Sequence, residues 1–270
     1  MLCTVVVPAY NQGRYLAACL DSLWFQDHKD LEIVVVQDAS TDDTPQVLAA
    51  YQEGLPRDAV SYASRYDPET DTLERVHHPR YPAAGRSLRV IEHPRNMGLA
   101  AALNTGFSVA TGQACTYVPA DDWCLPQMIA ELARALEHTP ADFAYADMLI
   151  VDDAMRVVRR FDLPDYSFSR SFADWYLCGN CKLYRRELHA RFGFYDTALL
   201  AHDHDLFQRF ALGGARFVHV SKALMAVRDH AERQVDIHAP DNWARLVGES
   251  KSLVLKARKH LRDGHGPAGA

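Results

Sequence analysis

The fold is decided by residues 2–24, LCTVVVPAYNQGRYLAACLDSLW, which join a short apolar run to an amphipathic segment. The first part, residues 2–8, is continuous and rich in valine, as in a strand that is buried on both faces. After a polar break at 11–13, apolar side chains recur at the spacing of one helix face. The stretch therefore predicts a buried strand followed by an amphipathic helix.

The same pattern repeats directly downstream. LEIVVV at 31–36 predicts a second buried strand, and the Ser/Thr/Asp cluster at 38–44 is suited to begin a helix. Two strand–helix units in succession favour a parallel sheet with right-handed connections. Further along, we expect strands near 88–92, 114–118, 143–151, 155–161, 181–185 and 215–220, and helices near 98–110, 126–137, 169–177, 203–212 and 241–262.

Residues 54–87 interrupt this rhythm. They hold four prolines and show no sustained period, which predicts an insertion or a long loop. No linker divides the rest of the chain. We expect one domain over 1–240, with a first half at 1–125 that carries the insertion and a second half at 126–240. Residues 241–270 are expected to form a C-terminal helix and a disordered Gly/Pro tail.

The composition excludes several classes of protein. The formal net charge of −6 disfavours a nucleic-acid partner, and no apolar run is long enough for a transmembrane helix. The first residues lack the basic segment of a signal peptide. A zinc site at Cys178-Gly-Asn-Cys181 would need two further ligands, and no second C-x-x-C is present. The cysteines instead suit buried thiols in a reducing cytoplasm.

Polar clusters follow three of the expected strands, at Pro8-Ala9-Tyr10-Asn11, at Asp38 and at Asp121-Asp122. Open parallel sheets bind ligands at the carboxyl ends of their strands, so these clusters are expected to converge. Neither a G-x-G-x-x-G turn nor a G-x-x-x-x-G-K-[ST] loop is present, which disfavours NAD enzymes and P-loop NTPases. Taken alone, the Asp pair has two interpretations: ligands for a hard divalent cation, or a cap for the helix expected near Pro126.

Four blocks of sequence resemble family two of the nucleotide-sugar glycosyltransferases, in the order in which that family has them. They are VVVPAYNQGRYLAACLDSL, EIVVVQDASTDDT, NMGLAAALNTGFSVATGQACTYVPADDW and FGFYDTALLAHDHDLFQRFALGG. The resemblance implies the GT-A fold, a Rossmann-like α/β fold with a mostly parallel central sheet, flanking helices and a smaller mixed acceptor-side region. It also implies an inverting, Mn²⁺- or Mg²⁺-dependent transfer of a sugar from a nucleoside diphosphate, expected to be UDP, to an acceptor hydroxyl.

The resemblance makes 1–125 the nucleotide-binding half and 126–240 the acceptor-binding half of a glycosyltransferase domain over 1–240. It also implies the residues that contact the nucleotide. Asp38 matches the second Asp of the family's V-D-D-G-S block and would accept a hydrogen bond from the base. The first Asp and the Gly of that block are replaced here by Gln37 and Ala39. The family's first nucleotide-contacting loop is matched by Pro8, Tyr10 and Asn11.

Roles in metal binding and catalysis follow in the same way. Asp122 of the D-x-D-type motif would bind the metal directly, with Asp121 nearer the ribose or the donor sugar. Asp203 matches the first Asp of the family's E-D-x-D-L block and would be the catalytic base, although His202 replaces the usual Glu. Arg228-Asp-His230 resembles the family's R-x-H, which makes His230 a third metal ligand or a pyrophosphate contact.

This set of residues suits the chemistry. A single carboxylate can take the proton of the acceptor hydroxyl, and a metal ion can neutralise the leaving diphosphate. A glycosidase would need two opposed carboxylates. Two alternatives stay open: a sugar-nucleotide pyrophosphorylase, and a non-catalytic nucleotide or glycan binding module on the same fold. The first lacks a Gly-rich phosphate loop, and the second is motivated by the departures at Gln37, Ala39 and His202.

The expected partners are a nucleoside diphosphate sugar and a glycan or lipid-linked acceptor. An aromatic and polar segment with Trp175, Tyr176, Asn180 and Lys182 is the expected acceptor region. The basic end of the helix at 241–262 either contacts an anionic membrane or favours the helix macrodipole; the macrodipole is the simpler explanation. We expect a cytoplasmic protein, peripheral at the inner membrane face if the helix binds there.

Overall fold

The computed structural model describes residues 1–56, 59–174, 176–229 and 240–263. Its first half contains β1 (Cys3–Ala9), α1 (Gly13–Trp24), β2 (Leu31–Gln37), α2 (Thr44–Gly54), β3 (Ala59–Asp67), β4 (Thr72–Pro79), β5 (Arg86–Glu92), α3 (Leu99–Ser108), β6 (Ala114–Tyr117) and β7 (Trp123–Cys124). Its second half contains α4 (Met128–His138), β8 (Phe143–Val151), β9 (Val157–Phe161), η1 (Ser169–Asp174), β10 (Lys182–Arg185), α5 (Glu187–Phe192), α6 (His202–Leu212), β11 (Phe217–Arg228) and α7 (Pro240–Arg262).

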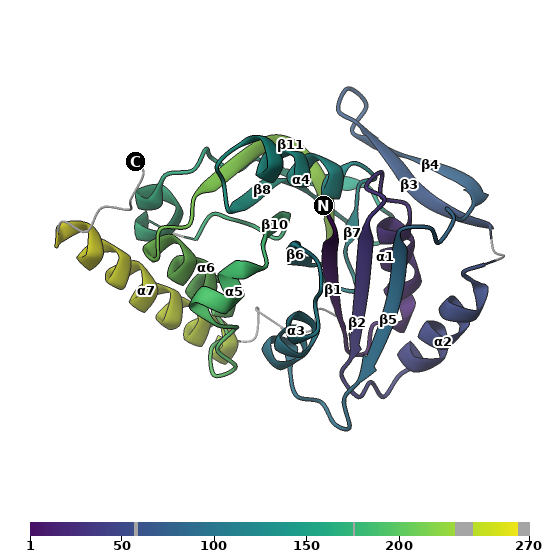
Figure 1. The fold of residues 1–270 in the computed structure, drawn as a ribbon, viewed down its shortest axis with the longest axis horizontal. Helices are drawn as coiled ribbons and strands as arrows, with labels where there is room; N and C mark the ends of the chain where they lie inside the picture. The colour runs from purple at the N-terminus through teal and green to yellow at the C-terminus, as the bar shows by residue number, and fades with distance from the viewer. Residues whose placement is uncertain (57–58, 175, 230–239, 264–270) are drawn as a thin grey trace.

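One curled sheet runs through the molecule in the order β5-β2-β1-β6-β10-β8-β11-β7, with β9 paired to β8 (Figure 1). The strands β5, β2, β1 and β6 are parallel and in register, so their carboxyl ends meet along one edge. Beyond β6 the sheet is mixed, because β10 pairs antiparallel with both of its neighbours. The expected α/β fold, with a mostly parallel central sheet, flanking helices and a smaller mixed region, is confirmed.

Helices cover both faces of this sheet. One apolar cluster joins it to α1, α2 and α4, and a second joins it to α3, α6 and α7. The valine-rich strands β1 and β2 are buried along their whole length, as a strand covered on both faces requires. At Gly106, α3 approaches β1 so closely that a Cβ atom would lie 2.3 Å from Val6 Cγ1. This contact fixes α3 beside the carboxyl end of β1.

The segment at 54–87 differs from the expected irregular loop. It forms an antiparallel hairpin, β3–β4, whose register shifts between Ala63 and Arg65. The hairpin extends from the side of the molecule that carries α2 (Figure 1). It pairs only with itself, and Tyr66 and Leu73 are its apolar contacts with a small cluster around Trp123. A strand pair with so little buried surface has no strong alternation, which explains why the sequence pattern did not indicate it.

The second half holds the other differences. The helix expected near 169–177 is the short π-helical segment η1, and the strand expected near 215–220 continues as β11 to Arg228. Neither β7 nor α5 was expected from the sequence. Both are short: β7 is a two-residue strand that exists through its pairing with β11, and α5 is a single turn and a half after β10.

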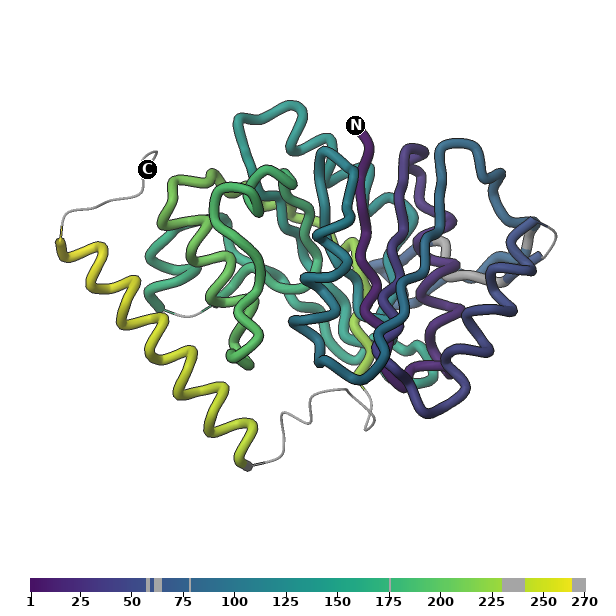
Figure 2. Tube along the Cα trace, turned by 60° about the horizontal axis from the view of Figure 1, so that its bottom comes forward, coloured from purple at the N-terminus to yellow at the C-terminus, as the bar shows by residue number. Residues whose placement is uncertain are grey.

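The C-terminal helix α7 lies along the outside of the molecule, at the opposite end from α2 (Figures 1 and 2). It packs on η1 and α6 through Leu253, Val254 and Ala257. The tail expected to be disordered, 264–270, lies outside the described residues. No helix of the described ranges combines the length and the apolar character that crossing a membrane requires. All six cysteines are buried free thiols, as their apolar neighbours predicted.

Candidate active site

A cavity of about 230 Å³ lies at the carboxyl edge of β1 and β2, beside the start of α3. It brings together three of the residues that the sequence assigned to the nucleotide: Pro8, Tyr10 and Asp38. The opposite wall comes from the loop before α3 and from its first turns, through Asn96, Gly98, Leu99 and Ala102. The convergence predicted from three strand ends therefore occurs for the first two of them.

The Asp38 carboxylate is 3 % exposed and is held by the loop that leads to α3. Its Oδ1 accepts a hydrogen bond from the Met97 amide at 2.9 Å, and its Oδ2 accepts one from the Gly98 amide at 2.8 Å. The His93 ring places Nδ1 2.6 Å from Oδ1 and Nε2 2.9 Å from the Thr105 hydroxyl. Asp38 thus orders one wall of the cavity, in addition to the base contact that the family pattern predicts for it.

His93 was not identified from the sequence as a site residue. A signal was present, because His93 directly follows the expected strand at 88–92, just as Asp38 follows the strand at 31–36. The parallel register of β2 and β5 carries both residues to the same edge. A polar residue that directly follows a parallel strand is therefore a candidate for this edge even where no acidic cluster is present.

Asn11 does not line the cavity but joins the loops after β1 and β2. Its Oδ1 accepts a hydrogen bond from the Thr41 amide at 2.8 Å, and its own amide donates to the Ser40 hydroxyl at 3.1 Å. Asn11 has a φ of 52° and Ala39 one of 56°, both in the left-handed region. Asn tolerates this conformation, whereas Ala is strained there, so Ala39 occupies a position that favours glycine.

The Asp121-Asp122 pair lies in the turn between β6 and β7, and the two residues are 9 % and 2 % exposed. Asp122 Oδ1 accepts a hydrogen bond from the Arg228 amide at 2.9 Å, and the Asp121 carbonyl accepts one from Arg228 Nε at 3.2 Å. The alternative role as a helix cap is wrong, because α4 begins at Met128 after the capping residue Gln127. The pair is anchored to the end of β11 instead.

Arg228 puts a buried cation beside this pair. Its guanidinium carbon lies 4.7 Å from the ring centroid of Tyr15 and 5.0 Å from that of Trp123, and Nη1 is 3.9 Å from Asp153 Oδ1. The sequence analysis named Arg228 as part of an R-x-H pattern but predicted no function for Arg228 itself. His230, the proposed third metal ligand of that pattern, lies outside the described residues.

Within the described residues, no group of three His, Cys, Asp or Glu side chains could hold a metal ion. The two buried carboxylates of Asp121 and Asp122 nevertheless fit a hard divalent cation, because such ions take carboxylate oxygens together with phosphate oxygens and water. A site with two protein carboxylates is typical where the substrate's phosphates complete the coordination. The residues present fit a metal that arrives with a nucleotide.

Asp203 lies in the first turn of α6, and its side chain is 17 % exposed. Its Oδ2 accepts a hydrogen bond from the Tyr117 hydroxyl at 2.5 Å and lies 3.5 Å from Lys182 Nζ. Burial would raise the pKa of Asp203, but the charges of Lys182 and His202 and the Tyr117 hydrogen bond lower it overall. Asp203 is therefore ionised near neutral pH.

Tyr117 connects this carboxylate to the Asp pair. It is the last residue of β6, and Asp121-Asp122 follow in the turn after it. The third strand end of the predicted set thus carries both the Asp pair and the contact to Asp203. The neighbouring Asp205, by contrast, pairs with Arg209 on its own helix at 2.8 Å.

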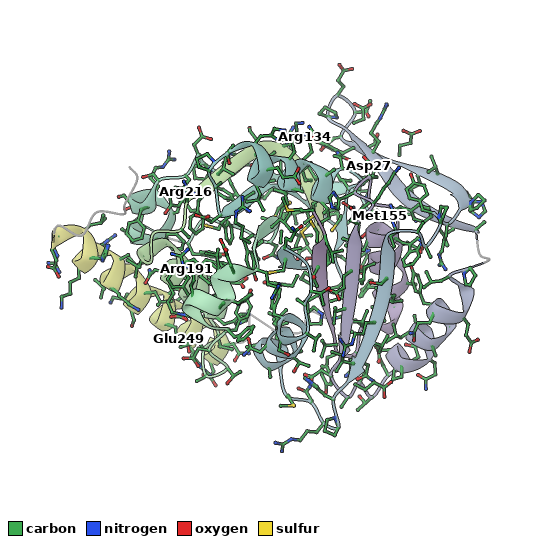
Figure 3. The ribbon with its side chains drawn as sticks, viewed as in Figure 1. Asp27, Arg134, Met155, Arg191, Arg216 and Glu249 are labelled. Carbon is green, nitrogen blue, oxygen red and sulfur yellow. The ribbon has the colours of Figure 1, made fainter. Side chains whose placement is uncertain are left out.

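The segment before Asp203 is held from α7. Glu249 Oε2 accepts hydrogen bonds from the amides of Leu200 and Ala201 at 2.7 and 2.9 Å. Figure 3 labels Glu249 on α7, where it lies beside the second half of the sheet. Lys182 of the expected acceptor region is fully buried next to Asp203, and Trp175 of the same region lies outside the described residues.

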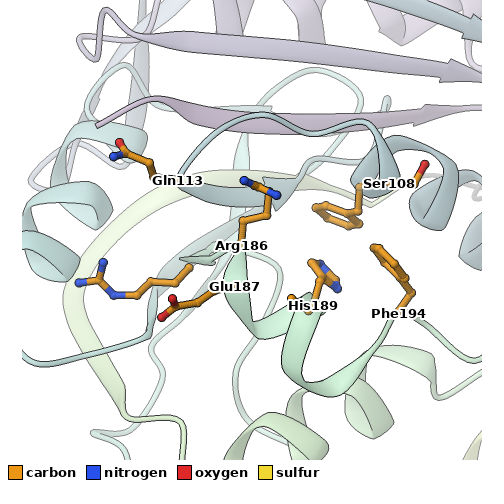
Figure 4. Close-up of a pocket in the computed structure, with 9 residues that line it drawn as sticks. Ser108, Gln113, Arg186, Glu187, His189 and Phe194 are labelled. Atoms are coloured by element: carbon orange, nitrogen blue, oxygen red, sulfur yellow. The ribbon is translucent and has the colours of Figure 1, made fainter.

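A larger cavity, of about 600 Å³, lies away from these residues (Figure 4). Its lining includes Gln113, Arg186, His189 and Phe194. Gln113 precedes β6, so this cavity is at the amino end of the parallel strands, opposite the edge that carries Asp38 and the Asp pair. Volume alone does not identify the functional site of this molecule.

Residues 4–65 and 67–193 match the sequence profile of Glycosyl transferase family 2, which covers more than half of the chain. Glycosyltransferase GlyG of Streptococcus pneumoniae is 23 % identical over 92 % of this chain and 77 % of its own length. Glycosyltransferase GlyA of the same organism is 26 % identical over 83 % of this chain, which spans only 30 % of GlyA. A PGL/p-HBAD biosynthesis glycosyltransferase of Mycobacterium bovis is 27 % identical over 72 % of this chain and 62 % of its own length.

Two solved structures share the fold. TarS 1–349 of S. aureus in complex with UDP-GlcNAc superimposes with a TM-score of 0.68, at 20 % identity over 95 % of this chain and 66 % of TarS. The mannosyltransferase PcManGT of Pyrobaculum calidifontis, in complex with GDP-Man and Mn²⁺, gives a TM-score of 0.65 at 24 % identity. That match covers 98 % of this chain and 65 % of PcManGT.

Proposed function

The chain belongs to Glycosyl transferase family 2, and from this premise we propose that it is an inverting, metal-dependent glycosyltransferase. It transfers a sugar from a nucleoside diphosphate to an acceptor hydroxyl. The observation that carries the proposal is the hydrogen bond between Tyr117 and Asp203. This bond joins an ionised carboxylate to the strand whose next turn bears the Asp121-Asp122 pair.

Asp203 is the proposed catalytic base. A carboxylate that is already ionised can accept the proton of the acceptor hydroxyl as that oxygen attacks the anomeric carbon, which contributes roughly 10²–10⁴-fold to the rate. Tyr117 and Lys182 both contact Asp203 Oδ2, which fixes the orientation of the carboxylate. One base and direct displacement give inversion.

Asp122 is the proposed direct ligand of Mn²⁺ or Mg²⁺, with Asp121 beside the ribose or the donor sugar and His230 as a third ligand or a pyrophosphate contact. When bound, such an ion neutralises charge on the leaving diphosphate as a Lewis acid. Arg228 holds the Asp122 carboxylate in place through its amide and adds a fixed cation nearby. The Mn²⁺ complex of PcManGT supports metal use.

The nucleotide is proposed to bind in the cavity formed by Pro8, Tyr10 and Asp38, with Asn11 holding the adjoining loops together. Tyr10 and the apolar Leu99 and Ala102 offer surfaces for a base, and Asp38 offers a polar edge. UDP is the proposed nucleotide of the donor, in line with the TarS complex with UDP-GlcNAc, whereas PcManGT is in complex with GDP-Man. The two related structures make base identity a question for direct measurement.

The acceptor is proposed to be a glycan or a lipid-linked sugar, made at the inner membrane face for the cell envelope. The exposed face of α7 supports contact with an anionic membrane. Trp243 and Leu255 are both 53 % exposed there. Exposed cations of the same helix are Arg245, Lys251, Lys256, Arg258, Lys259 and Arg262. This local positive charge contrasts with the net charge of −6 of the whole chain.

A panel of nucleoside diphosphate sugars tests the proposal, with thermal stability and donor hydrolysis measured with and without Mn²⁺. We expect stabilisation and slow hydrolysis by one donor, both dependent on the metal and both reduced in Asp122→Asn. Glu69→Gln, on the exposed hairpin, is the control and should behave as the wild type. Stabilisation without any turnover, even when acceptors are added, would favour the binding module. Absence of any metal-dependent response would overturn the proposal.

A further inference from the structure

Lys182 is a fully buried lysine whose charge the mechanism above does not use. It lies at the start of β10, in the middle of the sheet, between β6 and β8. Its Nζ is 4.3 Å from the ring centroid of Tyr117 and 5.1 Å from that of Phe207, and it donates to the Gly179 carbonyl at 3.2 Å. A buried ammonium is costly, so its surroundings must compensate the charge.

The compensating anion is Asp203. Its Oδ2 lies 3.5 Å from Lys182 Nζ and is the only carboxylate oxygen of the described residues paired with this ammonium. The Tyr117 hydroxyl binds the same oxygen from the other side, while its ring faces the ammonium. Lys182 and Tyr117 thus both hold the same oxygen of the carboxylate, Oδ2.

We propose that Lys182 is a positioning residue that keeps the Asp203 carboxylate charged and fixed in the orientation in which it meets the acceptor hydroxyl. The inference rests on the proposed function of Asp203 as the base. Lys182 itself does not touch the acceptor, because it is fully buried beneath the carboxylate. Its action on the reaction passes through Asp203.

The titratable groups around Asp203 determine what happens without Lys182. They are Tyr117 from β6, Lys182 from β10, Tyr176, Cys178 and Tyr195 from the loops that flank η1 and α6, and His202 from α6. Lys182 is the first among those that lower the pKa of Asp203, and burial is the factor that raises it. Removing the ammonium therefore leaves burial to dominate, and the carboxyl protonates at a higher pH.

Lys182→Met tests this through the pH dependence of kcat/KM, because Met keeps the length of the side chain and removes only the charge. The acid limb of the profile should move to higher pH by about one unit or more. Below the shifted pKa, kcat/KM should fall about tenfold for each pH unit. Donor KM should stay unchanged. Lys222→Met, which breaks an exposed ion pair with Glu131, is the matched control and should keep the wild-type profile. A uniform loss at every pH would overturn the proposal.

A second measurement does not depend on activity. Lys182→Met, Asp203→Asn and the double variant are compared in thermal unfolding at neutral pH. Each single change leaves a buried charge alone, so each should lower the melting temperature, and the double variant should recover most of that loss. Additive losses would show that the two groups are not coupled and would overturn the proposal. Lys182→Gln serves in the same comparison if the Met variant does not fold.

The two measurements separate the two hypotheses. Coupling in the unfolding cycle, together with a wild-type protein that hydrolyses no nucleotide sugar, would retain the buried pair and reject the proposed function. Turnover in the wild type with no coupling and no shift of the acid limb would retain the function and reject the role of Lys182.

Discussion

Asp38 and Asp203 are both buried carboxylates beside the carboxyl ends of parallel strands, yet they are held in different ways. Asp38 accepts hydrogen bonds at both oxygens, from two backbone amides and with the His93 ring alongside. Asp203 is held through side chains, with the Tyr117 hydroxyl and the buried Lys182 ammonium on its Oδ2. A carboxylate bound by backbone amides fixes a loop, whereas one held by side chains and a counter-charge suits the role of base proposed for Asp203.

The largest expected effect separates the two carboxylates by kinetics. Asp203→Asn should lower kcat by roughly 10²–10⁴-fold while donor binding, measured by calorimetry, stays within about twofold of the wild type. The Asn side chain keeps the shape but cannot take the proton. Asp205→Asn, in the same helical turn and paired only with Arg209, is the matched control and should keep most of the activity. Equal losses in the two variants would remove the basis for choosing Asp203.

Asp38→Asn should show the converse. The Asn side chain has one accepting oxygen where Asp38 uses two, so either the Met97 or the Gly98 amide loses this bond, although the Gly98 amide also donates to Asn96 Oδ1 at 2.9 Å. We expect the free energy of unfolding to fall by about 1–3 kcal/mol and donor affinity to fall by roughly tenfold. Denaturant unfolding and calorimetry measure the two effects. Unchanged stability would mean that the loop before α3 does not depend on this carboxylate.

The region around Asp203 should also respond to acid. Near Asp203, burial lowers the pKa of His204 to about 4, from a usual value of 6.5. The folded state therefore keeps this imidazole neutral while the unfolded state takes up a proton, so stability is complete above pH 6.5 and is lost between pH 6.5 and about 4. The loss should reach about 3 kcal/mol at most.

His204→Phe tests this assignment. The ring is stacked on Tyr176 at 5.4 Å, and neither of its nitrogens has a hydrogen-bond partner among the described residues. Phe should therefore preserve the packing and flatten the stability profile between pH 4 and 6.5. His189→Phe is the contrasting variant, because His189 has the same lowered pKa but is hydrogen-bonded to Tyr184, and it should lose stability at all pH values. An unchanged acid profile in His204→Phe would contradict the assignment.

The smallest effect concerns the loop next to Asp38. Ala39 has a φ of 56°, so Ala39→Gly should raise the free energy of unfolding by about 0.5–1 kcal/mol, after allowance for the greater freedom of glycine in the unfolded chain. Ala49→Gly, on the exposed face of α2, should lower it by about 1 kcal/mol. If the free energy of unfolding rises in one Ala→Gly variant and falls in the other, the backbone conformation at the substituted position is the cause.

The sequence predicted the first half of the fold well because its signals are local. The strands at 2–8 and 31–36 are continuous apolar runs, and each ends in a polar residue that parallel register carries to one edge. Pro8, Tyr10 and Asp38 therefore meet in one cavity, as expected. The hairpin β3–β4 lacked such a signal, because its strands pair only with each other and bury little apolar surface.

The surroundings of the proposed base could not be found in this way. Asp203 came from a resemblance, whereas its partner Lys182 is 21 positions away and was assigned to the acceptor region. Likewise, His93 is 55 positions from Asp38. Glu249 reaches the segment before Asp203 from α7. Such pairs depend on how strands and helices pack, and no spacing along the chain encodes them.

The stereochemistry of the first-formed product tests the central claim most directly. Proton NMR can follow the anomeric signal of the sugar released from an α-linked nucleoside diphosphate donor, with water or an added acceptor hydroxyl as the nucleophile, before mutarotation sets in. A single base at Asp203 and one direct displacement predict the β anomer, and Asp203→Asn should form it far more slowly. The α anomer as the first product would contradict the account.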